Sequence, residues 1–343
     1  MKSRSLWTAL SAPIGICLTI IIGVGSVAQA APLKKSLCVY DPSGANGDLF
    51  NAMKSYQLEA LSWGIEFVLK PYTDEKTAAD DFKAGQCDAA LITGTRVRPF
   101  HKFSGTLEAM GALPSYQHLA RIVRSLSKPK AKKLMTSGKY EVAGIWPGGA
   151  VYLFVRDRNV DTVAELAGKR LATMSFDEAA KTMVRKIGAS LVAADVGTFA
   201  GMYNNGSVDA CYSPALGYKA LELYKGIGTK GGVIRYPLAQ MTLQLLIRTA
   251  DFPEGFGEKS RALAGKTFNE SLKMVRQADD GIPAKHWIDI SPADKERYDE
   301  MFLDVRIELR DSKGVYHRTG LKLLRKLRCK IDPGRGECVA KRE

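Results

Sequence analysis

Between residues 36 and 93 the chain alternates between short apolar runs and stretches of helical periodicity. Apolar runs of strand length, bounded by turn residues, occur at residues 36–40, 65–69 and 87–93. The segments between them, residues 49–60 and 75–84, carry their apolar side chains at helical spacing. Strands that alternate with helices predict a mainly parallel sheet with helices on both faces.

The same order of elements recurs downstream. A helix, a strand, a short helix and a strand are predicted at residues 177–187, 191–194, 197–205 and 208–212. In both units a helix ends at a glycine and the next strand opens with aspartate and alanine, in Gly85-Gln-Cys-Asp88-Ala and Gly206-Ser-Val-Asp209-Ala. Chance is the alternative, because helix-glycine-strand junctions are common. The matching order favours two related lobes, each with its own sheet.

Two long apolar stretches, residues 142–155 and 233–248, are candidates for crossings between the lobes. The predicted boundaries are 31–144 plus 238–265 for lobe one, 145–237 for lobe two, and 266–343 for C-terminal helices with a disulfide-closed basic tail. Ser291-Pro-Ala-Asp294 is typical of a helix start, with serine as the N-cap and proline in the first turn.

Residues 1–30 have the pattern of a secretory signal peptide. Lys2 and Arg4 precede an uncharged apolar stretch, and Ala28-Gln-Ala30 is the small-x-small pattern of a cleavage site. Cleavage predicts a mature chain that starts at Ala31 and is exported to the periplasm; a retained N-terminal anchor is the alternative. A lipid anchor on Cys17 is not expected, because Ile16 stands where a small residue is needed.

Export to an oxidising compartment allows the five remaining cysteines to form disulfides. Cys329 and Cys338 close a short loop that contains proline and two glycines, and we expect a bridge there. Cys38 and Cys87 lie on two strands that are plausible neighbours, so they are the second expected pair. Cys211 is left over, and its default interpretation is a buried free thiol.

The formal net charge is +14, and loss of the first thirty residues leaves +12. Residues 313–343 contain ten basic and three acidic residues, so much of the excess is in the tail. A basic tail can meet nucleic acid or anionic lipid. Nucleic acid is not expected for an exported chain without an aromatic-studded basic stripe or zinc-finger spacing. The other interpretation is a solvated amphipathic helix at residues 321–327.

Signals for catalysis are weak. The four histidines, at positions 101, 118, 286 and 317, lack metal-ligand spacing and are expected at the surface. The sequence has no Gly-x-Ser-x-Gly elbow, phosphate loop or His-Glu-x-x-His string. Cys211 has no evident histidine partner in the sequence. We therefore expect no enzyme activity, no cofactor and no metal.

Candidate ligand-binding residues follow from the predicted strands. Ligands of open α/β sheets bind at the carboxyl ends of strands, where helix N-termini present free N–H groups. Side chains at these ends, and at the two crossings, are hydroxyl, amide, acidic, aromatic or guanidinium groups. They are Asp41, Asn46, Thr93, Arg96, Arg98, Trp146, Thr173, Ser175, Tyr212 and Gln240.

Several segments resemble a known group of proteins. Leu166-Ala-Gly-Lys-Arg170 and Tyr203-x-x-Gly206-x-Val-Asp209-Ala are similar to the second lobe of solute receptors from tripartite (TRAP-type) transporters. A closer resemblance is to the AdeT-type family of solute-binding proteins, which is also labelled as an RND-type efflux component. It rests on the segments Cys38–Gly47, Phe82–Asp88, Gly138–Gly144 and Leu223–Gly231.

The resemblance implies a two-lobed type II periplasmic-binding-protein fold of the α/β class, with a helical C-terminal extension. It further implies a monomer that captures a small polar or anionic solute between its lobes and delivers it to membrane transporter subunits. An accessory role beside an RND-type efflux pump is the alternative. Receptors of this class hold a carboxylate with an arginine shortly after the Leu-x-Gly-x-Lys segment. This sequence offers Arg170 early and has Ala172 or Thr173 where that arginine is expected.

Overall fold

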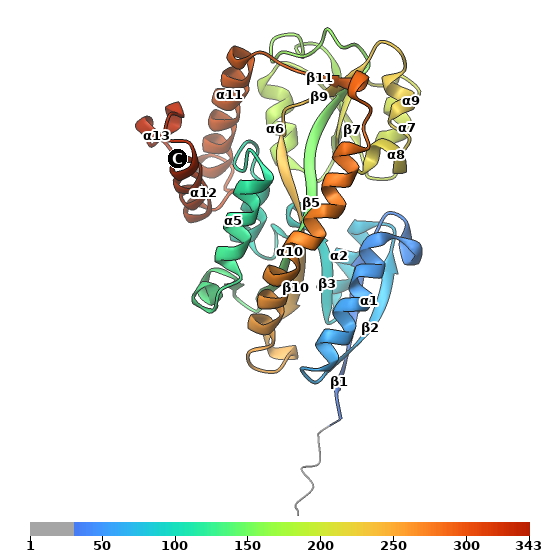
Figure 1. Ribbon diagram of the computed structural model, residues 1–343, viewed down its shortest axis with the longest axis vertical. Coiled ribbons are helices and arrows are strands. Elements are labelled where there is room, and N and C mark those ends of the chain that lie inside the picture. Colours follow the sequence, from blue (N-terminus) through green and yellow to red (C-terminus); the bar gives the residue numbers. More distant parts are fainter. Residues whose placement is uncertain (1–30) are drawn as a thin grey trace, which may run out of the picture. The chain divides into compact units, whose positions relative to one another are not determined.

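The computed structural model describes residues 31–343, and Pro32–Glu343 forms one compact unit (Figure 1). The expected signal peptide, residues 1–30, lies outside the described residues. Among the residues that are described, no helix has the length and apolar character needed to cross a membrane.

The first half of the sheet is built from the predicted N-terminal unit. Strand β1 (Leu33–Tyr40) pairs in parallel with β2 (Ile65–Tyr72) and with β3 (Ala89–Thr93). Helices α1 (Asp48–Leu61) and α2 (Glu75–Ala84) connect these strands, close to the positions expected from the periodicity. Side chains of β1 alternate between the two faces of the sheet, so each face has its own apolar core.

The second half repeats this arrangement. Strand β6 (Arg170–Met174) pairs in parallel with β7 (Ser190–Ala194) and β8 (Ala210–Pro214), with α6 (Glu178–Lys186) and α7 (Phe199–Asn204) as connections. The strand order β2-β1-β3 of the first half therefore corresponds to β7-β6-β8 of the second. This correspondence supports the duplication predicted from the sequence.

The repeated Gly-x-x-Asp-Ala motif has the same structural role in both halves. Gly85 and Gly206 end their helices with positive φ angles of 83° and 85°, a conformation that glycine adopts without strain. The carboxylate of Asp88 accepts the backbone N–H of Ser36 at 2.7 Å, and that of Asp209 accepts the backbone N–H of Arg170 at 2.8 Å. Each aspartate thus ties the start of β3 or β8 to the neighbouring strand.

The two halves share their hydrogen bonds through two long strands. The first part of β5 (Tyr140–Val155) pairs with β10 (Ala239–Arg248), and its last five residues pair with β8. Because β10 also pairs with β3, all strands are linked into a single hydrogen-bonded sheet. The expectation of a separate sheet in each lobe differs from this result, since the crossing segments are themselves paired strands.

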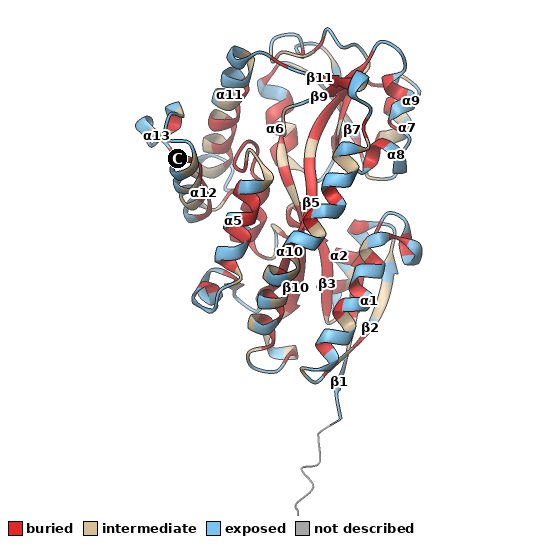
Figure 2. Cartoon of the chain, viewed as in Figure 1, coloured by how far each residue is buried: buried red, intermediate tan, exposed pale blue. Residues whose placement is uncertain are grey.

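Helices cover both faces of this sheet, and the long helix α10 (Phe256–Asp280) lies along β5 (Figures 1 and 2). Buried residues concentrate on the strands and on the sides of the helices that face them. The remaining short strands are β4 (Thr136–Ser137), β9 (Gly232–Ile234) and β11 (Trp287–Ile288). The remaining helices before the C-terminal extension are α3 (Gly94–Val97), α4 (Lys102–Gly105), α5 (Tyr116–Leu126), α8 (Gly217–Ala220) and α9 (Tyr224–Ile227), with 3-10 turns at Gly44–Asn46, Thr106–Glu108, Pro129–Leu134, Thr249–Asp251 and Ala284–His286.

Both expected disulfides are present. Cys38 of β1 is bonded to Cys87, which precedes the neighbouring strand β3, and Cys329 is bonded to Cys338. Cys211 on β8 is a buried free cysteine, as expected. Its burial raises the pKa of the thiol well above the ordinary value.

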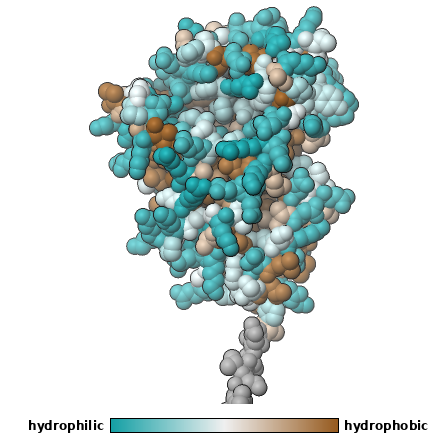
Figure 3. Space-filling view, in the orientation of Figure 1, coloured by the Kyte–Doolittle hydropathy of each residue, from teal (hydrophilic) through white to brown (hydrophobic). Residues whose placement is uncertain are grey.

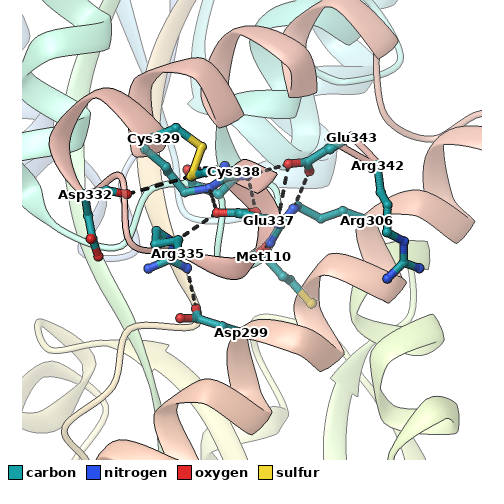
Figure 4. Close-up of polar contacts among 12 residues, drawn as sticks. Met110, Asp299, Arg306, Cys329, Asp332, Arg335, Glu337, Cys338, Arg342 and Glu343 are labelled. Carbon is teal, nitrogen blue, oxygen red and sulfur yellow. Dashed lines mark hydrogen bonds and ion pairs between the residues drawn. A yellow bond between two sulfur atoms is a disulfide. The ribbon is translucent and has the colours of Figure 1, made fainter. Parts of the chain in front are cut away.

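The C-terminal extension consists of α11 (Pro292–Asp311), α12 (Arg318–Ile331) and α13 (Gly336–Ala340). Arg306 of α11 and Arg328 of α12 are almost completely buried, and both bind the side-chain carboxylates of Glu337 and Glu343. Figure 4 shows Arg306 with Glu337 and Glu343. Each arginine also donates one hydrogen bond of 2.8 Å to the loop before α5, at the carbonyls of Met110 and Ala112.

Because Arg328 and Glu337 are buried, the basic tail is not a purely solvated helix. Burial on its own raises the pKa of Glu337, but the hydrogen bonds and charge of Arg328, with the charge of Arg306, lower it to about 2. The Glu337 carboxylate is therefore ionised, and its charge balances part of the charge on the two guanidinium groups. Buried charges are tolerated only when they are paired and hydrogen-bonded, as they are here.

We predict that Arg328→Met lowers the free energy of unfolding by about 3–5 kcal/mol, because it leaves Glu337 and Glu343 as buried carboxylates with one cation fewer. Urea unfolding followed by circular dichroism measures the change. Lys322→Met on the exposed face of the same helix is the control and is expected to shift the value by less than about 0.5 kcal/mol. Equal unfolding free energies for the two variants would contradict the assignment.

Candidate functional site

The carboxyl ends of the parallel strands carry most of the predicted site residues. In each half the two central strands run in parallel, β1 with β3 and β6 with β8, so their carboxyl ends share one edge. The segment after β3, Thr93–Arg98, belongs to the first half of the sheet, and the segment after β6, Ser175–Asp177, belongs to the second. The structure brings these two segments into direct contact.

Two arginines of the first half make this contact. The guanidinium carbon of Arg96 lies 3.5 Å from the centre of the Phe176 ring, a cation–π distance. An Nη atom of Arg98 lies 3.6 Å from a carboxylate oxygen of Asp177. We call Arg96, Arg98, Phe176, Asp177 and Tyr316, which is described next, the inter-lobe cluster. Arg96 and Arg98 were expected from the sequence; Phe176 and Asp177 were not.

Tyr316 reaches the cluster from the C-terminal extension. It lies in the loop between α11 and α12, is buried, and has its ring 5.2 Å from the guanidinium carbon of Arg98. Burial, together with the charge of Asp177 and against that of Arg98, raises the pKa of Tyr316 to about 12. No signal in the sequence pointed to this tyrosine, because it follows the last predicted strand by about a hundred residues.

Some buried polar atoms near the junction of the halves have no protein partner. The side chain of Gln240, which pairs in register with Ala150 of β5, is 1% exposed, and neither its amide oxygen nor its amide nitrogen is hydrogen-bonded. The hydroxyl of Tyr316 is also unpaired. An unsatisfied buried polar group is unfavourable by about 1–3 kcal/mol, so these atoms favour a polar occupant.

Two internal carboxylates occupy the backbone donors after β3. Glu108 accepts the N–H groups of Gly94 at 2.9 Å and Thr95 at 2.6 Å, and also that of Thr242 at 2.6 Å. Glu75 accepts the N–H of Thr93 at 2.6 Å. The start of α3 is therefore already satisfied by the protein, and an anion at this edge has the arginine side chains as its donors.

The predicted loop after β1 is organised in a similar way. The buried carboxylate of Asp41 accepts three backbone N–H groups, from Ser43, Leu49 and Phe50, at 2.8–3.0 Å. Asp41 therefore holds the loop and the start of α1, and we leave it out of the proposed site. Asn46 is exposed at the tip of this loop.

In the second half, three predicted residues line the end of β6. The hydroxyl of Tyr212 accepts the backbone N–H of Met174 at 3.0 Å, and burial followed by the charge of Asp177 raises its pKa. Thr173 is fully buried and donates to the carbonyl of Leu171, whereas Ser175 is exposed and donates to the carbonyl of Ala194. Tyr212 and Ser175 thus lie beside the inter-lobe cluster.

Trp146 and Arg170 lie elsewhere. Trp146 packs with its ring centre 5.9 Å from that of Tyr56, in the core between the sheet and α1. Arg170 stands at the beginning of β6, at the opposite end from Ser175, and binds the carboxylate of Asp209 at 2.7 Å. Both side chains have partners within the protein, so we leave both out of the proposed site.

Two of the four histidines are buried, contrary to expectation. His101 is 1% exposed and accepts the backbone N–H of Ser104 at the start of α4, and burial lowers its pKa to about 4. His118 is also buried, beside Ser115. Among the described residues no cluster of histidine, cysteine or acidic side chains has the makeup of a metal site.

The described residues also form two surface hollows, and neither is lined by a residue of the inter-lobe cluster. One, of about 220 Å³, is lined by Lys186, Glu308 and other residues between α6 and α11. The other, of about 370 Å³, surrounds Lys132 and Glu258. Neither contains a predicted site residue.

A hydrogen-bonded tyrosine–aspartate pair lies at the junction of the two halves. The backbone N–H of Ala150 donates to the hydroxyl of Tyr116 at 3.0 Å, and this hydroxyl donates to Asp279 of α10 at 2.7 Å. Burial raises the pKa of the Asp279 carboxyl to about 6. The contact connects α5, β5 and α10 where the chain crosses between the halves.

Comparison with known proteins identifies close relatives. The family model for solute-binding protein AdeT 1/2 matches residues 62–343. The probable solute-binding protein AdeT1 of Acinetobacter baumannii is 39% identical over 301 residues, which cover 88% of this chain and 99% of that protein.

Solved structures of TRAP periplasmic solute-binding proteins share the fold. One from Ralstonia eutropha H16 with bound (S)-2-acetolactate has a TM-score of 0.70 at 12% identity, covering 87% of this chain and 99% of that chain. One from Rhodoferax ferrireducens with bound malonate has a TM-score of 0.67 at 13% identity, covering 86% and 98%. The α/β fold class expected from the sequence is thereby confirmed.

The raised pKa of Asp279 predicts a specific pH dependence of stability. Between pH about 4 and 6 the folded protein binds the Asp279 proton more tightly than the unfolded chain does. This contribution to stability is therefore complete below pH 4 and is lost as the pH rises through 6. Urea unfolding at pH 4 and pH 7 is expected to show a loss on the order of 1–2 kcal/mol that Asp279→Asn removes. Glu270→Gln, at an exposed position of the same helix, is the control; equal pH slopes in both variants would reject the assignment.

Proposed function

The chain belongs to the AdeT 1/2 family of solute-binding proteins, and on this basis we propose that it captures a small organic anion between two lobes for delivery to a membrane transporter. The proposed anion site is the inter-lobe cluster, with Tyr212, Ser175 and Gln240 as neighbouring polar groups. Binding leaves the solute chemically unchanged.

The observation that carries the proposal is the pair between Arg98 and Asp177. Arg98 comes from the first half, Asp177 from the second, and their charged groups meet at 3.6 Å. In this arrangement the carboxylate of Asp177 is paired with the guanidinium group to which, in our proposal, the carboxylate of the ligand binds. Arginine suits such a ligand because its planar guanidinium can donate two parallel hydrogen bonds.

Similar proteins support the choice of an anion. The two TRAP receptors described above contain malonate and (S)-2-acetolactate, which are both carboxylates. This chain has Ala172 or Thr173, inside β6, where the resemblance led us to expect an arginine. We propose that Arg96 and Arg98, from the opposite half, replace it.

Ligand entry requires the halves to separate, and the structure suggests where the chain bends. We propose lobes at residues 31–144 plus 238–265 and at 145–237, which meet at the middle of β5. There the register between β5 and β10 shifts, and Gly149 has a φ of 109°, which other residues rarely adopt. A strand with an interrupted ladder and a glycine is suited to absorb the rotation of a hinge.

We further propose that the protein acts in the periplasm after removal of residues 1–30, alongside transporter subunits. A receptor that releases its solute to a transporter needs reversible closure, which a ligand bridging both lobes provides. Nothing among residues 31–343 favours the alternative of an efflux accessory component.

A pair of substitutions with opposite effects tests the anion site. Arg98→Met is expected to weaken the binding of a carboxylate roughly 10- to 150-fold, because a hydrogen-bonded charge partner is lost. Asp177→Asn is expected to strengthen it, because the internal competitor loses its charge while asparagine still caps α6. Melting temperatures measured with different carboxylates first identify the one that raises the melting temperature most. Calorimetric titration of each variant with that carboxylate, with malonate and with 2-acetolactate then gives the dissociation constants.

Arg297→Met, at an exposed ion pair on α11, is the matched control and is expected to leave affinity unchanged. Stabilisation by polyamines and by no carboxylate would contradict an anionic ligand. Weaker binding in the Asp177→Asn variant would contradict the competition between Asp177 and the ligand.

Counting thiols tests export and the state of Cys211 together. With both disulfides formed and residues 1–30 removed, denatured protein is expected to react with one equivalent of a thiol reagent and native protein with none, because Cys211 is buried and its pKa is raised. Two equivalents after denaturation would show that Cys17 and the leader are retained. A reaction in the native state would show that Cys211 is accessible.

A further inference from the structure

Two segments carry as much positive charge as the net excess of the whole chain. Residues 109–140 contain seven lysines and arginines and no aspartate or glutamate, and residues 312–331 contain another seven with no acidic residue. The formal net charge of the chain is +14.

The fold places these two segments side by side. Residues 109–140 include α5 and the 3-10 turn Pro129–Leu134 that follows it, and residues 312–331 include α12. Helix α12 packs against α5, as Figure 1 shows. Two basic segments that are far apart in the sequence are therefore neighbours in the fold.

Most of these cations face solvent without an acidic partner. Ten of them are exposed and make no ion pair with any carboxylate in the part of the chain that the structure describes: Arg121, Arg124, Lys128, Lys130, Lys132, Lys133, Lys139, Lys322, Lys326 and Lys330. We call these ten residues the basic face. By contrast, Lys313 pairs with Glu178 and Arg318 with Asp311. Cations without acidic partners repel one another, and binding to an anionic surface reduces this repulsion.

We infer that the basic face docks the exported protein on an anionic phospholipid surface. Eight of the ten cations are lysines, which are hydrated point charges that bind by long-range attraction rather than by the geometry of a protein partner. Leu134, between Lys133 and Met135, is 37% exposed and is the one large apolar side chain within the basic turn that reaches solvent. In the view of the molecule in Figure 3 hydrophilic residues predominate, with scattered hydrophobic patches. This composition fits binding to headgroups without insertion.

The expected strength follows from the number of charges. A lysine or arginine close to an anionic leaflet raises the partition constant roughly fivefold. Part of the face is balanced by Glu254 and Glu258, which line the same hollow as Lys132. Because the attraction decays over a Debye length of about 10 Å at 0.1 M salt, binding is reversible and decreases with ionic strength.

Docking of this kind would keep the receptor next to the membrane proteins that it serves. The basic face does not include any residue of the inter-lobe cluster, so solute capture and membrane docking are separable. The inference rests on export, but it does not depend on which solute is bound.

Co-sedimentation with phospholipid vesicles tests the inference. The chain from Ala31 onward is used, because Pro32–Glu343 is a single compact unit and a retained leader would insert by itself. Binding is expected to vesicles with 30% phosphatidylglycerol at 0.1 M salt, to be absent for pure phosphatidylcholine, and to be lost at 0.5 M salt. Replacing Lys128, Lys130, Lys132 and Lys133 by glutamine is expected to reduce the partition constant at least 25-fold, about fivefold for each of at least two lysines.

The matched control replaces four exposed lysines outside the basic face by glutamine, at Lys54, Lys83, Lys219 and Lys230. It has the same net charge as the test variant and is expected to bind like the unaltered protein. Equal loss of binding in the two variants, or no binding of the unaltered protein to anionic vesicles, would overturn the inference. The carboxylate affinity of the test variant should be unchanged, which separates this result from a failure of the proposed function.

An acidic membrane protein is the competing partner. It would be indicated by binding to native membranes that disappears after their proteins are digested, with no binding to protein-free vesicles. That outcome would overturn docking on lipid. Retention on protease-treated membranes and on anionic vesicles alike would support it.

Discussion

The backbone hydrogen bonds of β5 are the constraint on which the remaining structure depends. One stretch of this strand completes the first half of the sheet through β10, and the other completes the second half through β8. Helix α10 packs along β5, so the same strand carries the core across the junction. Because both halves attach to β5, the segments after β3 and after β6 meet each other, and the inter-lobe cluster exists only through that meeting. The hinge that we propose lies at a shift of register between β5 and β10.

The protein uses its own carboxylates to satisfy the backbone at most of the strand ends. Asp41 caps the loop into α1, Glu108 holds the start of α3, and Asp88 and Asp209 tie neighbouring strands together. A strand end or helix start is therefore not automatically a ligand site, since its N–H groups can already be filled. What stays available at this edge is the guanidinium group of Arg98, which is paired with the carboxylate of Asp177 from the other half. This available guanidinium group is the basis on which we propose an anionic solute.

The C-terminal extension contributes to three properties of the molecule. Its buried arginines bind the last residue of the chain and the loop before α5, which fixes the extension onto the body of the fold. Tyr316, in the loop between α11 and α12, is part of the inter-lobe cluster. Its exposed lysines join those around α5 in the basic face. The extension is thus part of the proposed site and of the proposed docking surface.

The sequence by itself determined the local structure and the covalent links. The helix expected at 75–84 is observed at Glu75–Ala84, because periodicity and turn residues are local properties. Both disulfides have the expected pairs, Cys329–Cys338 because it closes a short loop and Cys38–Cys87 because their two strands were expected to be neighbours. It also indicated Arg96 and Arg98, since they follow a recognisable strand. Only the tertiary structure decided which groups surround them. Phe176, Asp177 and Tyr316 come from segments that are distant from these arginines in the sequence. Long-range strand pairing also decided that Trp146 packs against Tyr56 and that Arg170 binds Asp209 at the other end of β6, which is why we leave both out of the proposed site. An alternating pattern shows that side chains point to two faces, but not which face meets the other half.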